Sequence, residues 1–313
     1  MVTIIDGGGA ANKHRGVYIN SGGTIEGFTV RNGYLPSGGP LFLGAGICLE
    51  PPSGGTVTNC IVRDNYIGRG RGAGIYIGVG CIGKIDNCQI YSNTAFNGVG
   101  GVYAYYSSGG TRLNNCVIWG NKVTAGAGYA VFGGGIVVSS ASLSMRNCLV
   151  YSNSLPIGQN DSGGGGLFSN SGNLSMENCT ITKNTSEQKG GGIYIAACNA
   201  VRNSIIYDNF TTNVSVYPDV YTTNNQLTNC CIGDTNGVLN WNTSGNITNN
   251  PVFVDAAGYN YRLTPSSPCI NTGTNQSWMT NGVDLDGAAR IRYERVDMGA
   301  YEKIYEGTIY RFY

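Results

Sequence analysis

The densest group of charged side chains lies near the C-terminus. Its members are Asp284, Asp286, Asp297, Glu302, Arg290 and Arg292. The pattern Asp-x-Asp-Gly that begins at Asp284 resembles part of a calcium loop, but the remaining spaced ligands of an EF-hand are missing. We therefore favour a turn closed by Asp–Arg pairing over a calcium site formed by Asp284, Asp286 and Asp297. The sequence predicts no cofactor, with calcium as the alternative.

Acid–base groups for cleaving a polysaccharide are not evident elsewhere. A lyase needs a Lys or Arg base beside a group that neutralises the substrate acid, and a hydrolase needs two carboxylates across one bond. The acids of the central region are isolated from one another: Asp64, Asp86, Asp161, Glu177, Glu187 and Asp208. The single histidine, His14, has no acid nearby, which favours a solvated loop histidine. No catalytic residue is assigned, and an enzyme stays open as the alternative.

Cysteines recur at regular steps. Six of the eleven occupy one position of a repeat: Cys60, Cys88, Cys116, Cys148, Cys179 and Cys230. Ser204 takes this position between Cys179 and Cys230, and successive copies of the position are then 25 to 32 residues apart. Residues in register on neighbouring parallel strands hold their Cβ atoms about 4.8 Å apart, which exceeds the roughly 3.5–4.5 Å of a disulfide. No CxxC pair or histidine partner suggests zinc. We predict buried thiols that act as small apolar side chains. The irregular Cys48, Cys81, Cys198, Cys231 and Cys269 cannot be paired.

The cysteines belong to a longer repeat. The phrase Asn-Cys-x-Ile/Val-x-x-Asn begins at Asn59 and recurs from Asn87, Asn115, Asn147 and Asn178. A Gly-rich phrase that becomes an alternating strand precedes each copy, as in Gly74-Ile75-Tyr76-Ile77. A period of this length with short strands and no helical pattern is typical of one solenoid coil. We predict an all-β, single-stranded parallel β-helix of about eight coils over residues 1–235.

The last asparagine of each phrase follows a strand, where the chain must bend. These residues are Asn65, Asn93, Asn121, Asn153, Asn184 and Asn209. Asparagine tolerates left-handed backbone and bonds locally, and amides stacked one per coil can also bond to each other along the axis. We expect a structural role for this array.

Aromatic side chains occupy two outward slots. The first strand of each coil carries Tyr76, Tyr103 and Tyr194, and the second carries Tyr91, Trp119, Tyr151 and Tyr207. Strand alternation places both sets outside the solenoid. They can stabilise the sheet by stacking, or they can form a platform for sugar rings. We predict that Tyr91, Trp119 and Tyr151 form a continuous exposed patch, unless a loop from the longer step between Cys116 and Cys148 covers it.

Composition excludes two classes of partner. Among 313 residues the net charge is +1, with 19 basic and 18 acidic side chains scattered along the chain, which argues against nucleic acid. No apolar run is long enough to insert in a membrane. The chain starts almost inside a strand and without a signal peptide. We expect a mature or truncated form of a longer exported protein, with a complete chain as the alternative.

The repeats resemble those of right-handed parallel β-helix proteins of the pectate-lyase-like superfamily. The phrases Gly133-Gly134-Gly135-Ile136 and Gly190-Gly191-Gly192-Ile193 are similar to repeats of bacterial polymorphic outer-membrane proteins. Residues 236–302 are similar to the choice-of-anchor module of large secreted bacterial proteins, through Asn250-Pro251-Val252-Phe253 and Asp297-Met298-Gly299-Ala300. The choice-of-anchor module is expected to have a small residue at the position of Cys269 and an aspartate at the position of Asn271. Residues 303–313 form a strand-like tail.

The resemblance implies an exported, extracellular or cell-surface β-solenoid that binds, displays or assembles. Polysaccharide or another glycan is the expected partner, met through the aromatic stripes. We also expect self-association through the ends of the solenoid, because open rungs expose unpaired backbone groups. The alternative that the resemblance implies is a polysaccharide lyase or glycoside hydrolase.

Overall fold

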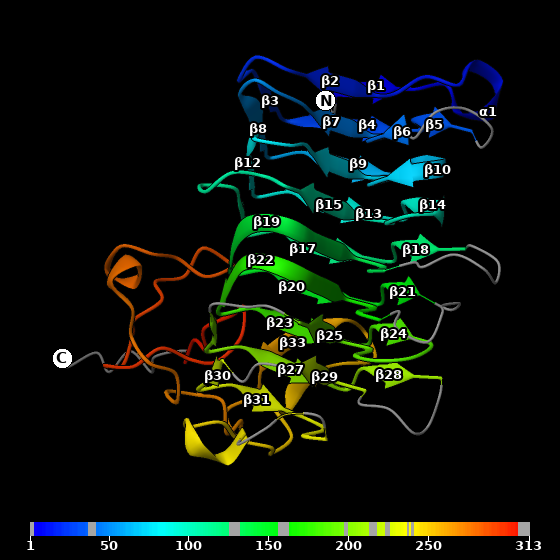
Figure 1. The fold of residues 1–313 in the computed structure, drawn as a ribbon. Helices are drawn as coiled ribbons and strands as arrows, with labels where there is room; N and C mark the ends of the chain where they lie inside the picture. The colour runs from blue at the N-terminus through cyan, green and yellow to red at the C-terminus, as the bar shows by residue number, and fades with distance from the viewer. Residues whose placement is uncertain are drawn as a thin grey trace.

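The computed structural model describes residues 3–36, 42–124, 132–155, 163–196, 200–212, 218–222, 226–236, 238 and 241–305. Cys198, Asp161 and residues 306–313 of the expected tail lie outside these ranges. The described chain is a parallel β-solenoid, with a C-terminal segment packed on one side (Figure 1).

One strand per coil forms the nine-stranded sheet A. Its strands, in spatial order, are β1 (Thr3–Asp6), β4 (Phe28–Arg31), β9 (Ile61–Arg63), β13 (Gln89–Tyr91), β17 (Val117–Trp119), β20 (Leu149–Tyr151), β23 (Thr180–Thr182), β27 (Ile205–Tyr207) and β31 (Cys231–Ile232). The pairing is parallel and in register, so that Ile90 lies between Val62 and Ile118. The strands after the cysteines of the repeat therefore stack directly on one another.

Sheet B has fourteen strands and two limbs. The first limb contains β2 (Val17–Ile19), β7 (Ile47–Leu49), β11 (Ile75–Ile77), β15 (Val102–Tyr105), β25 (Ile193–Ile195) and β29 (Val220–Thr222). The second limb contains β3 (Thr24–Glu26), β8 (Gly54–Thr58), β12 (Ile82–Asp86), β16 (Arg112–Asn114), β26 (Ala200–Arg202) and β30 (Leu227–Thr228). The long strands β19 (Ile136–Arg146) and β22 (Leu167–Glu177) run through both limbs and join them.

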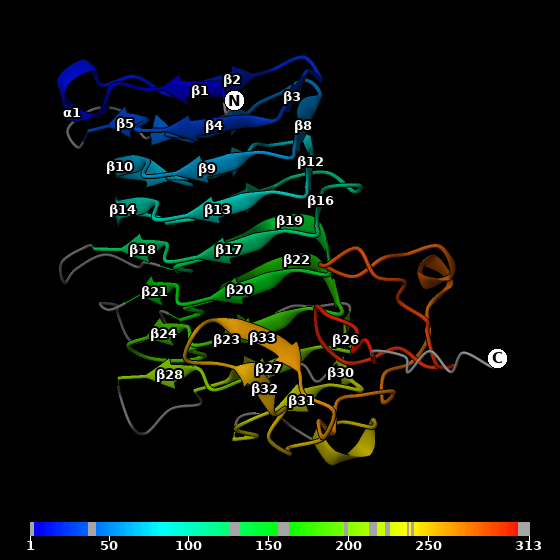
Figure 2. The ribbon, with the colours of Figure 1, turned by 180° about the vertical axis from the view of Figure 1, so that it is seen from behind.

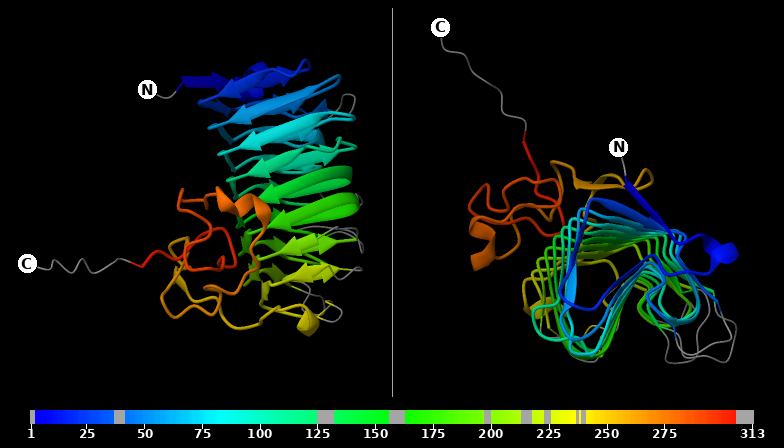
Figure 3. Two further views of the ribbon diagram at one scale, coloured as in Figure 1. Left: turned by 90° about the vertical axis from the view of Figure 1, so that its left-hand side faces the viewer. Right: turned by 90° about the horizontal axis from the view of Figure 1, so that it is seen from above.

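A sheet of short strands, sheet C, completes the cross-section. Its members are β5 (Tyr34–Leu35), β6 (Phe42–Leu43), β10 (Tyr66–Arg71), β14 (Thr94–Asn97), β18 (Lys122–Val123), β21 (Ser154–Leu155), β24 (Thr185–Ser186) and β28 (Phe210–Thr211). The first coil carries the short helix α1 (Gly9–Asn12) before β2 instead. Within the described ranges the solenoid has about seven turns, close to the expected number of about eight, and seven coils contribute to all three sheets. The view along the axis shows the coils superposed (Figure 3).

The interior of the solenoid is one apolar column. The middle residue of each sheet A strand points inward, as Val62, Ile90 and Ile118 do, and these side chains are fully buried. Complete burial of such a side chain contributes about 1.5–3 kcal/mol, so repetition over the coils supplies a large stabilising term. Gly101 shows why glycine precedes the inward strand: a Cβ there would lie 2.2 Å from the carbonyl oxygen of Gly135 on the next coil.

The C-terminal segment packs on the outer face of sheet A over its last coils (Figure 2). It contains η1 (Trp241–Thr243), the antiparallel pair β32 (Phe253–Asp255) and β33 (Asn260–Leu263), and η2 (Ser277–Thr280). Leu149 of β20 packs against Tyr261 and Tyr301, and Ile205 of β27 packs against Leu263. Burial of these outward side chains holds the segment on the solenoid.

A second row of asparagines fixes the segment by hydrogen bonds. The first asparagine of each repeat phrase has left-handed backbone, for example φ 51° at Asn147 and 50° at Asn178. The Asn147 amide donates to Val283 O (2.7 Å), that of Asn178 to Asp297 O (3.0 Å), and that of Asn203 to Thr274 O (2.9 Å). These turn residues thus serve as docking sites as well as bends.

No helix in the described part of the chain is long and apolar enough to span a membrane.

Candidate functional site

The asparagines after the sheet A strands form a buried amide ladder along the axis, as expected. The left-handed backbone of the bend lies one residue earlier than expected, for example at Asp64 (φ 56°) and Ser92 (φ 54°). Each side-chain amide donates to the side-chain oxygen of the next coil: Asn65 to Asn93 (2.8 Å), Asn93 to Asn121 (2.9 Å), Asn121 to Asn153 (2.9 Å), Asn153 to Asn184 (2.9 Å) and Asn184 to Asn209 (3.0 Å). Each also donates to a backbone carbonyl of the preceding coil, as Asn121 does to Ile90 O (2.9 Å). All six residues are buried, so the array is structural and inaccessible to a ligand.

The ladder ends on a carboxylate that the sequence did not single out. Asp219 Oδ1 accepts from the Asn209 amide (2.8 Å) and from Asn209 N (2.9 Å), and Asp219 Oδ2 accepts from Asp234 N (2.8 Å). Burial raises the pKa of Asp219 to about 6, against the lowering effect of these hydrogen bonds.

The recurring thiols line the interior, as expected. Cys60, Cys88, Cys116, Cys148, Cys179 and Cys230 are all fully buried. Each of the first four places its Sγ 3.1–3.3 Å from the carbonyl oxygen two residues earlier, for example Cys116 with Asn114 O at 3.2 Å. Every cysteine that the structure describes is a free thiol. Burial raises the pKa of Cys116, so this thiol is a poor nucleophile.

The first aromatic stripe points outward, as expected, but two of its members are too buried to serve as a platform for sugar rings. Tyr76 and Tyr103 point away from the solenoid interior but are 2% and 8% exposed. They form a second apolar cluster with Val99 and Val137, and Leu43 and Phe132 pack against it. Side chains that precede the strands therefore cover this face. Tyr194 is half-buried at the edge of the same cluster.

The second stripe forms a stack whose ring faces are already occupied. Tyr91 and Trp119 stack at 4.1 Å between ring centroids, and Trp119 and Tyr151 at 5.8 Å with an interplanar angle of 5°. All three side chains are half-buried, and Tyr151 ends the stack against Tyr261 of the C-terminal segment. Trp119 consequently offers an edge to solvent, since its neighbours cover both faces. Tyr207 packs within the interface to the segment.

The C-terminal acids close turns and pair with arginine. Asp284 Oδ1 accepts from Asp286 N (2.9 Å) and Ala288 N (2.7 Å), and Asp297 Oδ1 accepts from Asn271 N (2.7 Å). The fully buried Arg290 lies 3.3 Å from Glu302 Oε1. Asp286 forms a bidentate pair with Arg262 at 2.5 and 2.6 Å. Within the described ranges no three acidic, cysteine or histidine side chains are grouped to hold a metal ion.

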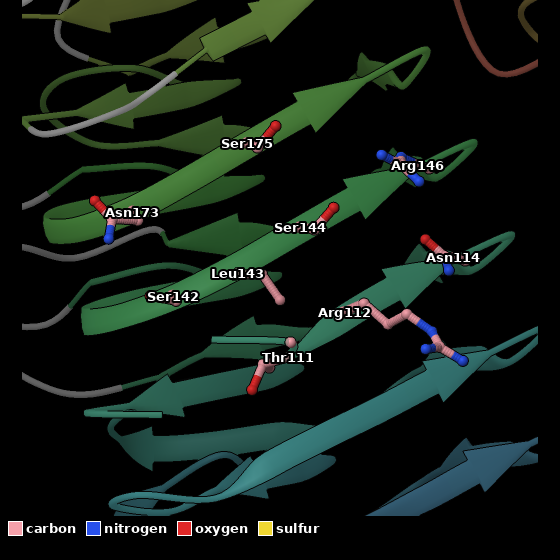
Figure 4. Close-up of a pocket in the computed structure, with 10 residues that line it drawn as sticks. Thr111, Arg112, Asn114, Ser142, Leu143, Ser144, Arg146, Asn173 and Ser175 are labelled. Carbon is pink, nitrogen blue, oxygen red and sulfur yellow. The ribbon is translucent and has the colours of Figure 1, made fainter. Parts of the chain in front are cut away.

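A polar groove of about 360 Å³ lies on the outer face of the second limb of sheet B. Figure 4 shows side chains of three successive strands that line it, including Arg112 and Asn114 from β16, Ser144 and Arg146 from β19, and Ser175 from β22. Arg112 pairs with Asp86 through two bonds of 2.7 and 3.0 Å, and Arg146 donates to Glu177 (3.0 Å). The two carboxylates beside the groove are therefore both ion-paired.

Two polar atoms at this groove lack a partner among the described residues. Asn114 Oδ1 is buried and accepts no hydrogen bond, although Asp86 and Arg146 flank Asn114 in register. Trp278 of η2, whose ring lies 4.8 Å from the Arg146 guanidinium, has an equally buried Nε1 without an acceptor. A buried polar group left without a hydrogen bond costs about 1–3 kcal/mol.

The groove continues toward the N-terminus along one register row. In the strand register, Lys84 lies between Thr56 of β8 and Arg112 of β16. The register partner of Arg112 on the next strand is Ser144, and that of Ser144 is Ser175. Thr56 and Lys84 line a second hollow of about 140 Å³. This polar row, defined as Thr56, Lys84, Arg112, Ser144 and Ser175, presents one hydrogen-bonding side chain per coil.

We did not predict the polar row from the sequence, where we considered the outward aromatic positions as the ligand-binding candidates. The signal was present in the strand before each Asn-Cys phrase, where alternate positions are polar, as in Lys84 and Asp86 of β12. Periodicity alone cannot show that a distant tryptophan from η2 borders these positions. His14 is exposed, in agreement with a solvated histidine.

Comparison with known proteins supports the architecture. The family model described as "Right handed beta helix region" matches residues 3–150, which extend from β1 into β20. A comparison with curated proteins finds no match. The chain is thus an all-β, right-handed parallel β-helix with almost no helical structure.

Proposed function

We propose that the chain binds a polysaccharide along the outer face of the second limb of sheet B. The observation that carries this proposal is the polar groove of about 360 Å³, which Arg112, Asn114 and Ser144 line together. Sugar hydroxyls donate to serine oxygens and accept from the N–H groups of arginine and asparagine side chains. The groove offers such acceptors and donors on three successive coils.

The spacing of the polar row suits a chain of sugars. Its five side chains are in register and therefore repeat about every 4.8 Å along the axis. Sugar rings in an extended chain repeat roughly every 5 Å, which nearly equals the spacing between successive coils. A polysaccharide parallel to the axis would meet a new hydrogen-bonding side chain at each ring. The stack of Tyr91, Trp119 and Tyr151 is less suitable, because its ring faces contact one another.

Affinity electrophoresis through gels that contain xylan, mixed-linkage β-glucan or polygalacturonate tests this proposal. We expect one of these polymers to retard the wild-type chain, and Asn114→Ala to weaken the interaction roughly tenfold, as loss of one hydrogen bond predicts. Thr228→Ala is the matched control, because Thr228 holds the same register slot outside the groove. Equal retardation of both variants, or free migration of the wild type in all gels, would contradict the proposal.

An extracellular or cell-surface location is part of the same proposal, since the expected ligand lies outside the cell. The resemblance of residues 236–302 to a choice-of-anchor module supports it. The test is accessibility on intact source cells: a protease added outside should digest the protein, whereas protection until the cells are lysed would overturn this location.

Self-association through the N-terminal rung is a second proposal. In the described chain β1, β2 and β3 lie at the ends of their sheet paths, so each has one edge without a neighbouring strand. Such an edge can pair with another strand, here that of a second copy. Ile4 and Tyr18 on this rung are 46% and 54% exposed. Light scattering should show a concentration-dependent dimer that Ile4→Pro abolishes, and a monomer at all concentrations would remove the proposal.

A further inference from the structure

A second polar pocket, of about 320 Å³, lies between the outer face of sheet A and the C-terminal segment. The solenoid contributes Asn87, Gln89 and Val117 to its lining, and the segment contributes Leu285 and Asp286. Small-molecule sites have volumes of roughly 300–1,000 Å³, so this pocket is large enough for a small ligand.

A chain of side-chain amides ends in this pocket. Asn147 donates to Asn115 Oδ1 (3.0 Å), and Asn115 donates to Asn87 Oδ1 (3.1 Å). Asn59, the next asparagine of this row, donates to Glu26 Oε1 (3.0 Å). The amide nitrogen of Asn87 is left without a partner among the described residues. Hydrogen bonds in a chain polarise one another, so the N–H groups of Asn87 are stronger donors than those of an isolated amide.

The other groups of the pocket suit a neutral ligand with hydroxyl groups. Gln89 is exposed, and its amide provides a donor and an acceptor that no described residue engages. Val117 and Leu285 offer half-buried apolar surface for the C–H groups of a ring. Among the described residues of the lining only Asp286 is charged, and Arg262 pairs with both of its carboxylate oxygens. A sugar ring, with hydroxyls at its rim and C–H groups on its faces, matches this set of groups.

The pocket and the groove on sheet B share one turn of the chain. Asn114 lines the groove, and the next residue, Asn115, lines the pocket, so the two sites lie on either side of the corner between sheets B and A. From Arg112 of the polar row to this corner the chain advances three residues, about 10 Å at 3.3 Å per residue. At roughly 5 Å per sugar ring, a branch of one or two sugars on a main chain that follows the polar row can reach the pocket.

We infer that this pocket binds a short, neutral sugar branch of the polysaccharide whose main chain lies along the polar row. The inference rests on the proposed function, since the groove must hold the main chain. Asn87 donates to a hydroxyl oxygen of the branch, Gln89 binds a second hydroxyl, and Leu285 contacts the C–H face of the ring. The ligand class is therefore a branched polysaccharide rather than a linear one.

Calorimetric titration of the full chain with matched oligosaccharides tests the inference. The ligands are main chains of four xylose, glucose or galacturonate units, each with and without a neutral branch of one sugar. For one of these main chains we expect the branched form to bind about fivefold or more tightly than the unbranched form, as one or two added hydrogen bonds predict. Equal affinity of the two forms would overturn the branch site alone, whereas a wild type that binds none of the ligands would overturn the groove as well.

Variants assign the preference to the pocket. Gln89→Ala should lower the affinity for the branched oligosaccharide to that of the unbranched one, and should leave the unbranched affinity unchanged. Asn87→Ala should do the same, which keeps the test valid if one variant fails to fold. Asn59→Ala is the matched control, because Asn59 holds the same turn position one coil earlier, with φ 53° against 54° at Asn87, and lies outside the pocket.

A groove variant separates the two sites. Asn114→Ala should weaken binding of both oligosaccharides, since the main chain is common to them. A preference for the branched form that survives in both Gln89→Ala and Asn87→Ala would contradict the assignment.

Discussion

At the scale of single residues, the structure depends on buried polar groups that satisfy one another from coil to coil. Each amide of the Asn65–Asn209 ladder donates twice and accepts at the oxygen, so its place in the core is fully compensated. An apolar side chain could fill the same space but would leave backbone groups unpaired. This explains why asparagine recurs after the sheet A strands while the neighbouring interior slot accepts Cys, Phe28 or Ser204.

Breaking one rung of the ladder should therefore be costly. Asn121→Ala removes the acceptor of Asn93 N (3.1 Å) and of the Asn93 amide (2.9 Å), and it removes a donor to Asn153. Each buried group left unpaired costs about 1–3 kcal/mol, so we expect a loss of at least about 2 kcal/mol in urea unfolding. Ser108→Ala, which loses one exposed bond to Gly80 O, should stay within about 0.5 kcal/mol of wild type. A similar small effect for both variants would refute the ladder.

The interior slot gives a related prediction. Cys116→Ser should be tolerated better than Cys116→Asp, because Ser204 already occupies an equivalent position whereas a buried carboxylate there has no charged partner. Thermal unfolding of the two variants measures the difference, and equal melting temperatures would argue against a buried slot.

Asp219 makes stability depend on pH. Its pKa of about 6 in the folded chain lies above the ordinary value of 3.8, so the folded state binds the proton more tightly. The stabilising contribution is then complete below about pH 4 and is lost as the pH rises through about 6, by at most about 3 kcal/mol. Asp219→Asn keeps an oxygen for Asn209 and should flatten the fall of melting temperature between pH 4 and 6. Parallel pH profiles for the variant and the wild type would contradict this.

At the scale of elements, the C-terminal segment converts part of an exposed sheet face into an interface. Leu149 and Ile205 point outward from sheet A and would be exposed without it. The segment contacts sheet A through apolar side chains and the adjacent turns through the amides of Asn147, Asn178 and Asn203. Apolar burial supplies the stabilisation, and the amides fix the position.

Tyr261 allows this interface to be tested. Its ring is buried against Tyr151 and Phe253, but its hydroxyl has no partner in the described structure. Tyr261→Phe should leave the unfolding free energy unchanged or raise it by up to about 1 kcal/mol, because it removes an unpaired polar group. Tyr261→Ala should lower it by about 3–5 kcal/mol. A loss of more than 1 kcal/mol in the phenylalanine variant would mean that the hydroxyl has a partner.

The elements also show where sequence reasoning reaches its limit. The coils, the amide ladder and the buried cysteine slot follow from the repeat, because period and alternation directly determine which side chains face inward. The burial of Tyr76 and Tyr103 does not follow, since it depends on Leu43, Val99 and Phe132, which precede the repeated strands and do not share their pattern. The groove beside Trp278 depends on docking of a segment more than 100 residues away from β19.

At the scale of the whole molecule, the solenoid turns a short sequence phrase into a row of equivalent positions along one axis. The interior positions build the core, and the outer positions of the second limb of sheet B build the polar row from Thr56 to Ser175. A ligand with its own repeat can match such a row, and its affinity should then depend on its length. This length dependence is the property that separates a polysaccharide groove from a site for a single sugar.

Calorimetric titration measures this dependence of affinity on ligand length directly. The ligands are oligosaccharides of two to eight sugars, taken from the polymer that retards the protein. The polar row spans four steps of about 4.8 Å, so affinity should rise up to about four or five sugars and then level off. Asn114→Ala should weaken binding of the longer oligomers, whereas Trp119→Ala should leave it unchanged. Affinity that does not depend on length, or binding lost in Trp119→Ala but retained in Asn114→Ala, would contradict a groove along sheet B.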